Sequence, residues 1–411
     1  MTNKMAIGII GLIIIVAFFV RVYKLSDIPN GAHIDEVATE VDAYNLLMTG
    51  VDSHNQRWPL FFNHYDEDYV EWMYTYLTIP FVKLFGPGVL AVRIPAALVG
   101  TLSIYIFYLL AKELFNRNVG LLTAALAAIS PWHLQFSRLG FRAVLAPLFI
   151  SLALYLFIKA LKAPKNFVWL GVVLGLSLHT YSVMRLFIPL MILVLAVGFY
   201  WQLLEIFNRS KKYFLIGVFI FIVLAVPIYN FAFFQGGNDR FYEISIVGQA
   251  NPVSHFMFHY LQHLSPQFLF LTGDANPWHS IPYFGQTLLV LAPFILLAYS
   301  IPHSKQREVL LLSAVFASAL IPASLTDQGI PHALRAIIAV PTLEMLAAFG
   351  IYLTNKTVTK AGVPGWFVTC AITAIISYNA ALFMYNYFVI YPKTVYVIDE
   401  QPPEIFINGL Q

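Results

Sequence analysis

Long apolar stretches recur along almost the whole chain, and they restrict its fold more than any other feature. A helix that crosses the hydrocarbon core of a bilayer needs about 20 mostly apolar residues. About eleven segments approach this length, at residues 5–22, 92–112, 118–132, 143–161, 166–181, 186–204, 213–234, 283–302, 308–325, 334–354 and 364–391. Hydrophobic residues make up 59% of the 411 residues and charged residues only 11%, which excludes a soluble enzyme, a disordered chain and a nucleic-acid-binding protein. The sequence predicts an all-α integral membrane protein with one polytopic domain over residues 1–411.

The basic residues predict on which side of the membrane each loop lies. Lys and Arg accumulate in short cytoplasmic loops, and the Lys-rich hairpins around residues 159–165 and 209–212 fall on the same side as the N-terminus. With the N-terminus in the cytoplasm, the chain is a multi-pass protein of the cell membrane with an extracytoplasmic C-terminus. Two long loops, 23–91 and 235–282, and a short tail, 392–411, then lie outside the cytoplasm.

Most acids and histidines fall in these extracytoplasmic segments, and the sharpest local pattern among them is His33-Ile34-Asp35-Glu36. Apolar residues follow at helical spacing, so Asp35 is expected at the N-cap or in the first turn of a helix, where the helix dipole favours a carboxylate. A carboxylate kept ionised beside the membrane can serve as a general base or as a metal ligand. A plain helix cap explains Asp35 equally well.

A second acidic group contains Asp66, Asp68 and Glu71. It precedes an apolar stretch, 72–85, that is too short and too interrupted to cross the membrane and is expected to form an interfacial or re-entrant helix. One of these acids, with Glu71 as the first choice, is expected to face Asp35 across a cavity as a second carboxylate. The alternative is a solvated helix start, and spacing alone does not decide between them.

Several arginines lie at membrane boundaries on the side that the positive-inside pattern disfavours. They are Arg93, Arg138, Arg142, Arg185 and Arg335, and His332 precedes the last of them. Arginine binds phosphate in a bidentate geometry, and the phosphate of a membrane lipid lies at this depth. Each of these side chains could also simply extend to the interface. The set as a whole predicts at least one phosphate contact.

Three histidines of the second long loop, His255, His259 and His263, recur at every fourth position. They would share one helix face, and an i, i+4 histidine pair can bind a divalent metal. The segment also has the composition of an amphipathic interfacial helix, which needs no metal. The sequence leaves both interpretations open.

Two further polar features remain. A tight loop with Asp274, Asn276 and His279 precedes a span and is expected to form either part of a substrate site or a plain turn. Glu344 is the one acid in the interior of a predicted span, because Glu308 stands at the edge of its own. An ionisable residue at membrane depth is by default a functional candidate, and a hydrogen bond to a neighbouring Ser, Thr or Tyr is the competing explanation.

The order of these motifs resembles a known family. The motifs are Asp35-Glu36, Leu84-Phe85-Gly86, Arg93-Ile94-Pro95, Ile129-Ser130-Pro131-Trp132, Gly273-Asp274 and Pro331-His332-Ala333-Leu334-Arg335. In this order they resemble the polytopic glycosyltransferases with the C-type fold, in particular the prokaryotic branch of the protein O-mannosyltransferase and aminoarabinose-lipid A transferase group. Each motif is short, so the specificity lies in their order along the chain.

This resemblance implies a membrane glycosyltransferase with a polyprenyl-phosphate-linked sugar donor and an extracytoplasmic acceptor, which is a protein hydroxyl, a lipid or a glycan. It implies that Asp35 is the catalytic carboxylate, a general base in an inverting transfer, with Glu36 as its partner. Arg93 matches the family arginine, and Arg138, His332 and Arg335 match donor phosphate-binding positions more loosely. The resemblance requires no cofactor, and a divalent metal (Mg, Mn or Zn) stays open. Many members carry a further C-terminal region, and acceptor recognition by such a region is expected to be either absent here or supplied by a protein partner.

Two other classes of function stay open at this stage. A transporter or flippase of lipid-linked sugars needs polar residues distributed through its spans, and Glu344 alone among the acids lies inside one. A metal-dependent oligosaccharyltransferase or ligase would use Asp35, an acid of residues 66–71 and the histidine face as ligands.

Overall fold

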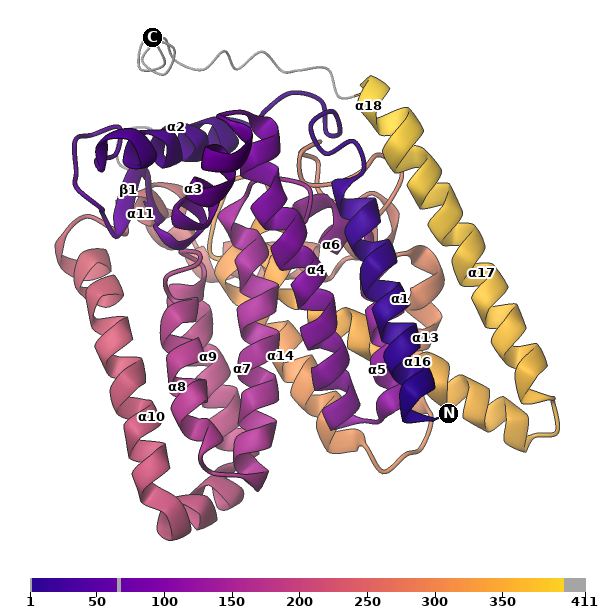
Figure 1. The fold of residues 1–411 in the computed structure, drawn as a ribbon. Coiled ribbons are helices and arrows are strands. Elements are labelled where there is room, and N and C mark those ends of the chain that lie inside the picture. The colour runs from indigo at the N-terminus through magenta and orange to yellow at the C-terminus, as the bar shows by residue number, and fades with distance from the viewer. Residues whose placement is uncertain (1, 65–67, 395–411) are drawn as a thin grey trace.

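The computed structural model describes residues 2–64 and 68–394 and shows a bundle of long helices with smaller elements gathered at one end (Figure 1). The long helices are α1 (Asn3–Val22), α4 (Val89–Leu114), α7 (Leu145–Lys162), α10 (Tyr200–Phe234), α14 (Gln306–Ser324), α16 (Val340–Lys360) and α17 (Gly365–Tyr385). Shorter apolar helices lie between them: α5 (Arg117–Ile129), α8 (Asn166–Ser177), α9 (Met184–Gly198) and α13 (Ala292–Ser300).

The predicted architecture of a multi-pass membrane protein is confirmed. In the described part of the chain, 7 helices are long and apolar enough to cross a membrane. The count of eleven spans is not established, because four of the predicted segments form helices of only 10–17 residues. One of them, α5, ends early because Ser130 leaves the helical conformation and caps the next helix, α6 (Pro131–Phe136). The orientation of the termini stays a prediction.

The first long loop folds over one end of the bundle (Figure 1). It contains α2 (Ile34–Thr49), α3 (Met73–Phe85) and two short strands, β1 (Phe61–His64) and β2 (Asp68–Glu71). Helix α3 is the non-spanning helix expected over residues 72–85. The antiparallel strands depart from the all-α expectation: they pair Phe62 with Val70, and both side chains are buried.

The second long loop forms α11 (Asp239–Ile244) and α12 (Pro252–Leu264). A backbone bridge between Ser245 and Thr326 joins it to the segment that follows α14. The remaining helical elements are short: η1 (Arg142–Val144), η2 (Ile246–Gly248), η3 (Gln267–Leu271), η4 (Leu289–Leu291), α15 (Ala333–Ala336), η5 (Ile337–Ala339), η6 (Asn386–Ile390) and α18 (Tyr391–Thr394). The N-terminus and α18 lie at opposite ends of the bundle (Figure 1).

A buried ion pair fixes the start of α2 against the bundle. Glu36 accepts two hydrogen bonds of 2.8 Å from Nε and Nη2 of Arg93 on α4. It also accepts the backbone N–H groups of His33 and Gly140, the first of which completes a capping box. Burial alone would raise the pKa of Glu36, but the contact with Arg93 outweighs it and holds the pKa below its usual value. The carboxylate is therefore ionised and fully occupied by protein donors.

Arg138 anchors the end of α1. Its guanidinium group is buried and donates to the carbonyl oxygens of Val20, Arg21, Tyr23, Lys24 and Ile28 at 2.7–3.3 Å. The last carbonyls of a helix have no partner within the helix, and a basic side chain can satisfy them. Arg138 therefore holds the connection between α1 and α2 in place.

Glu344 lies on α16 and is 1% exposed. Its polar neighbour is the side chain of Ser130, one of the residue types that the competing explanation named. The second carboxylate oxygen, Oε2, is buried and has no hydrogen-bond partner among the described residues. Glu344 is absent from the lining of the cavity described below.

Glu40 lies one turn beyond Glu36 on α2, and its environment should make the free energy of unfolding depend on pH. Burial, and then the charge of Glu36, raise the pKa of Glu40 to about 7 from 4.5. The folded protein therefore keeps a proton that the unfolded chain releases between these values, so the free energy of unfolding should fall as pH rises through this window. Thermal unfolding in detergent between pH 4.5 and 8 should show this fall in the wild type and a flatter profile in Glu40→Gln. Asp27→Asn, at an exposed acid, is the control, and an unchanged slope in Glu40→Gln would refute the assignment.

Candidate functional site

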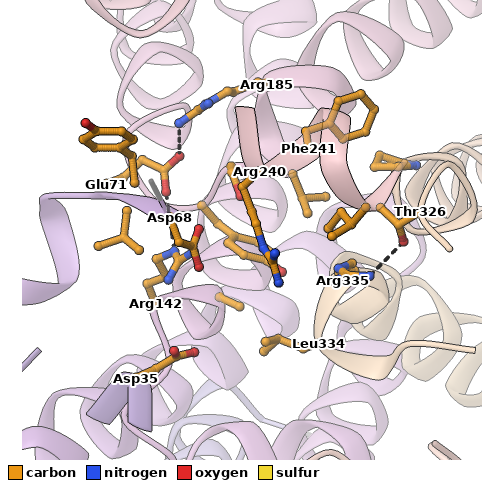
Figure 2. Close-up of a pocket in the computed structure, with 18 of the residues that line it drawn as sticks. Asp35, Asp68, Glu71, Arg142, Arg185, Arg240, Phe241, Thr326, Leu334 and Arg335 are labelled. Carbon is orange, nitrogen blue, oxygen red and sulfur yellow. Dashed lines mark hydrogen bonds and ion pairs between the residues drawn. The ribbon is translucent and has the colours of Figure 1, made fainter. Parts of the chain in front are cut away.

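A cavity of about 650 Å³ lies beneath the first long loop. Its wall is formed by residues from α2, β2, α3, the segment before α7, the start of α9, α10, α11 and the segment between α14 and α16. These elements are far apart in the sequence, so only the folded bundle brings their side chains together. The cavity contains both carboxylates and arginines, many of them labelled in Figure 2.

Asp35 reaches this cavity from the first turn of α2, where the sequence placed it. His33 is the N-cap, and its Nδ1 accepts the N–H of Asp35 at 3.1 Å. The carboxylate of Asp35 makes no hydrogen bond within the described chain, and its Oδ2 lies 3.8 Å from Nδ1 of His33. Asp35 thus carries a carboxylate that faces the cavity and remains available to a ligand.

Glu71 and two arginines form an ion-pair cluster on the cavity wall (Figure 2). Arg185 donates to Glu71 Oε1 at 2.8 Å, and Nε of Arg142 lies 3.5 Å from Oε2. Arg142 also lies over the ring of Tyr181, at 5.5 Å from its centroid. It makes no hydrogen bond with any residue that the structure describes, so its guanidinium N–H groups remain available to a ligand.

Arg335 approaches the cavity from the far side of this cluster, on α15 (Figure 2). Its Nη1 donates to Thr326 Oγ1 at 2.8 Å and to the carbonyl of Gln328 at 2.9 Å. Within the described residues these are its only hydrogen bonds made by the side chain, so Nε and Nη2 remain for a ligand. Arg240 lines the same space and pairs with Glu243 at 2.9 Å.

The predicted substrate loop forms a buried hydrogen-bonded turn. Asp274 accepts hydrogen bonds from the backbone N–H groups of Asn276 and Ala333. Its Oδ2 is also hydrogen-bonded to Nδ1 of His279, at 2.8 Å. The ring of His279 lies 4.7 Å from that of His332, and both line the cavity. Burial, and then Arg335, lower the pKa of His332 well below its usual value, so its ring is neutral at physiological pH.

The structure brings together one part of the predicted site and separates another. The predicted residues that line the cavity are Asp35, Asp68, Glu71, Asn276, His279, His332 and Arg335. Three predicted residues lie outside the lining: Glu36, Arg93 and Arg138. Glu36 and Arg93 are bonded to each other, and Arg138 donates to backbone carbonyl oxygens. The expectation that these two arginines hold phosphate is not favoured, because both Nη groups of each already donate to protein oxygens. Asp66 lies outside the described residues.

Three cavity arginines were not placed in the predicted phosphate site: Arg142, Arg185 and Arg240. The first two belong to the boundary arginines, so a signal for them existed in the sequence. Arg240 lies in the middle of a long loop with no neighbouring motif, and only the fold brings it to the cavity.

The cavity side chains are a poor match to a resident metal. Asp274, His279 and His332 approach one another closely enough to be considered as ligands. Both oxygens of Asp274 already accept hydrogen bonds, and Nδ1 of His332 accepts the N–H of Arg335. Metal ligands need free lone pairs, and Oδ2 of Asp274 already contacts two donors, which leaves this cluster one lone pair on Oδ1 and the outer ring nitrogens of the two histidines.

Part of the chain matches the model of a known protein family. Residues 72–229 match the family model described as dolichyl-phosphate-mannose-protein mannosyltransferase. No curated protein sequence matches the chain. The matched residues begin directly after β2 and extend to Tyr229 on α10, so they contain Arg142 and Arg185.

Solved structures match nearly the whole chain. ArnT from Cupriavidus metallidurans, bound to undecaprenyl phosphate, aligns with a TM-score of 0.58 and 14% identity over 100% of this chain and 75% of its own. The fold is that of the C-type glycosyltransferases. An oligosaccharyltransferase with this C-type fold, from Archaeoglobus fulgidus and tethered to an acceptor peptide, aligns with a TM-score of 0.56 and 14% identity over 95% of this chain and 55% of its own. The oligosaccharyltransferase AglB from Archaeoglobus fulgidus, in complex with an inhibitory peptide and a dolichol-phosphate, aligns with a TM-score of 0.52 and 12% identity over 94% of this chain and 55% of its own.

Proposed function

We propose that this C-type chain transfers a sugar from a polyprenyl-phosphate-linked donor to an acceptor on the extracytoplasmic side of the membrane. The observation that carries this proposal is the cavity in which Asp35, without a hydrogen-bond partner among the described residues, faces the same space as Arg142 and Arg335. A carboxylate and guanidinium groups are the two kinds of side chain that such a transfer requires. The proteins of similar structure include one bound to undecaprenyl phosphate and one bound to a dolichol-phosphate.

The donor's phosphate would bind to the arginine side of the cavity. Arg142 and Arg335 both have N–H groups that no described residue accepts, although Nε of Arg142 forms an ion pair with Glu71. Arg185 donates a hydrogen bond to Glu71. Guanidinium groups bind phosphate oxygens with short, directional hydrogen bonds. The isoprenoid tail would then extend along the apolar helices of the bundle, where lipid is the natural solvent.

The chemical step follows from the position of Asp35. The acceptor hydroxyl attacks the anomeric carbon while Asp35 takes its proton, so that a new C–O bond forms as the bond to the lipid phosphate breaks. The leaving phosphate carries the released electron pair, and Arg142 and Arg335 stabilise its charge. A single displacement of this kind inverts the anomeric configuration. Asp274 would act indirectly, by orienting His279 at the cavity wall.

Donor profiling tests the proposal. Purified protein in lipid vesicles is supplied with a panel of labelled polyprenyl-phosphate sugars and candidate acceptors, and the products are identified by mass analysis. We expect a glycosylated acceptor of inverted configuration and release of polyprenyl phosphate. Movement of the labelled lipid across the vesicle membrane without sugar transfer would contradict the proposal and favour a flippase. Transfer that strictly requires a metal in the cavity would favour the metal-dependent oligosaccharyltransferase or ligase.

We expect the substitution Arg335→Gln to lower the affinity of the protein for the donor. Removing charged hydrogen bonds to a phosphate should raise the apparent KM for the donor by about tenfold or more, with a smaller rise for Arg335→Lys, which keeps the charge but loses the planar donor pair. Steady-state transfer assays at varied donor concentration measure this effect. Arg57→Gln, at an exposed arginine of the first loop, is the matched control. An unchanged KM in Arg335→Gln would remove this residue from the donor site.

A further inference from the structure

A second cluster of ligand-type side chains lies outside the cavity lining. His255 and His259 on α12 and Asp327, which follows α14, offer ligand atoms that all lie within 4.8 Å of one another. We propose that these three side chains form a binding site for a divalent transition metal, with zinc as the best fit. This site shares no residue with the lining of the sugar-transfer cavity.

The residue types and spacing fit zinc. Two histidines one helical turn apart present their rings on the same face of a helix, and a carboxylate from another segment supplies a third ligand. Such a three-ligand site leaves one tetrahedral position for water. His259 is 4% exposed, whereas His255 is half-buried and Asp327 is exposed, so an ion can reach the cluster from solvent.

One distance favours a shared metal over a direct hydrogen bond. Nε2 of His259 lies 3.4 Å from Oδ1 of Asp327. A charge-assisted N–H···O bond is usually about 2.7–2.9 Å long. Two atoms bonded to one tetrahedral zinc at about 2.0–2.1 Å lie about 3.3 Å apart. The observed separation is close to the second value, and these two atoms form no hydrogen bond with each other.

The structure changes the ligand set that sequence spacing predicted. His263 follows His259 by four residues, but its ring is already occupied. Its Nδ1 bonds the carbonyl of His259 at 2.8 Å, and its Nε2 accepts the N–H of His332 at 3.0 Å. The sequence could not supply Asp327 as the third ligand, because this residue is distant in the chain.

The proposed ion would fix the loop that positions Arg335. Asp327 lies between Thr326 and Gln328, the two residues that accept hydrogen bonds from Arg335 Nη1. Its backbone N–H donates to Ile244 at 2.7 Å, which ties this loop to the second long loop. A metal held by Asp327 and α12 would therefore order one wall of the cavity. This consequence for the cavity rests on the proposed function, whereas the metal site does not.

Metal binding by the full-length protein tests the site without any sugar donor. Protein purified in detergent is treated with a chelator, desalted and titrated with Zn²⁺ and, separately, with Co²⁺. We expect about one equivalent of Zn²⁺ to bind per chain, the visible absorption bands of tetrahedral Co²⁺, and a rise in melting temperature with the metal. His255→Ala and Asp327→Asn should both lose the bands and the thermal shift.

The variants are chosen so that misfolding does not imitate loss of metal. His255 and Asp327 are not fully buried, and their variants should melt at the temperature of the metal-free wild type. His54→Ala, at an exposed histidine of the first loop, should bind as the wild type does. Absence of stoichiometric binding would overturn the proposal. So would binding that survives His255→Ala but is lost in His279→Ala, because the ion would then belong to the cavity cluster.

Discussion

Asp35→Asn should lower the rate of sugar transfer by about 10²–10⁴-fold, the range typical for the loss of a general base. The amide has nearly the same size and keeps its place in the first turn of α2, but it cannot accept the proton of the acceptor hydroxyl. Because Asp35 does not belong to the arginine side of the cavity, donor binding should change little. The effect should therefore appear in kcat, with KM for the donor close to that of the wild type. Steady-state transfer in vesicles and equilibrium binding of the labelled donor measure the two quantities separately.

Two comparisons make this result specific. Asp35→Glu keeps the carboxylate but moves it by one methylene, so it should retain more activity than Asp35→Asn. Asp27→Asn neutralises an exposed acid in the same connection and should behave as the wild type. If Asp35→Asn transferred sugar at the wild-type rate while the protein remained folded, Asp35 would not be the base.

Arg93→Met should destabilise the protein by about 3–5 kcal/mol, the usual result of removing one partner of a buried ion pair. Glu36 would then be a buried carboxylate that keeps only the N–H groups of His33 and Gly140. The carbonyl oxygens of Leu25, Pro29 and Gly31, which accept hydrogen bonds from Arg93, would also lose their donor. Thermal unfolding in detergent and the yield of folded protein measure the loss.

The double variant Glu36→Leu, Arg93→Met separates the two contributions. It removes both charges, so it should recover the part of the loss that comes from the unpaired carboxylate. The part that comes from the three carbonyl oxygens remains, and the N–H groups of His33 and Gly140 lose Glu36 as their acceptor. Arg57→Met, at an exposed arginine, should change the melting temperature little. A single variant Arg93→Met as stable as the wild type would show that the pair does not hold α2 in place.

The sequence predicted the elements whose signals are local. The long apolar stretches identified the long helices, and the apolar residues at helical spacing after Asp35 identified α2. The apolar stretch that became α3 was too short to span, and the structure places it across the end of the bundle. These conclusions could be drawn from the sequence because the length and the capping of a helix depend on residues that are close to one another in the chain.

The parts of the site that depend on distant partners were not predictable in this way. Arg93 and Arg138 have the same boundary position as Arg335, yet their donors are taken by Glu36 and by carbonyl oxygens of residues 20–31. Residue type and depth cannot distinguish a guanidinium that supports a loop from one that awaits a ligand. Strand β2 was missed for a related reason, because its acids concealed the pairing of Val70 with Phe62.

The contact between Arg138 and the end of α1 has a consequence for how the site assembles during synthesis. Arg138 follows Val20 by 118 residues and Ile28 by 110, so α1 enters the membrane long before this side chain leaves the ribosome. Until then, water and lipid headgroups must satisfy the carbonyl oxygens at the end of α1. The connection that leads to Asp35 can therefore reach its final position only after α6 has formed, and a nascent chain that ends before Arg138 would insert its first helix without aligning Asp35.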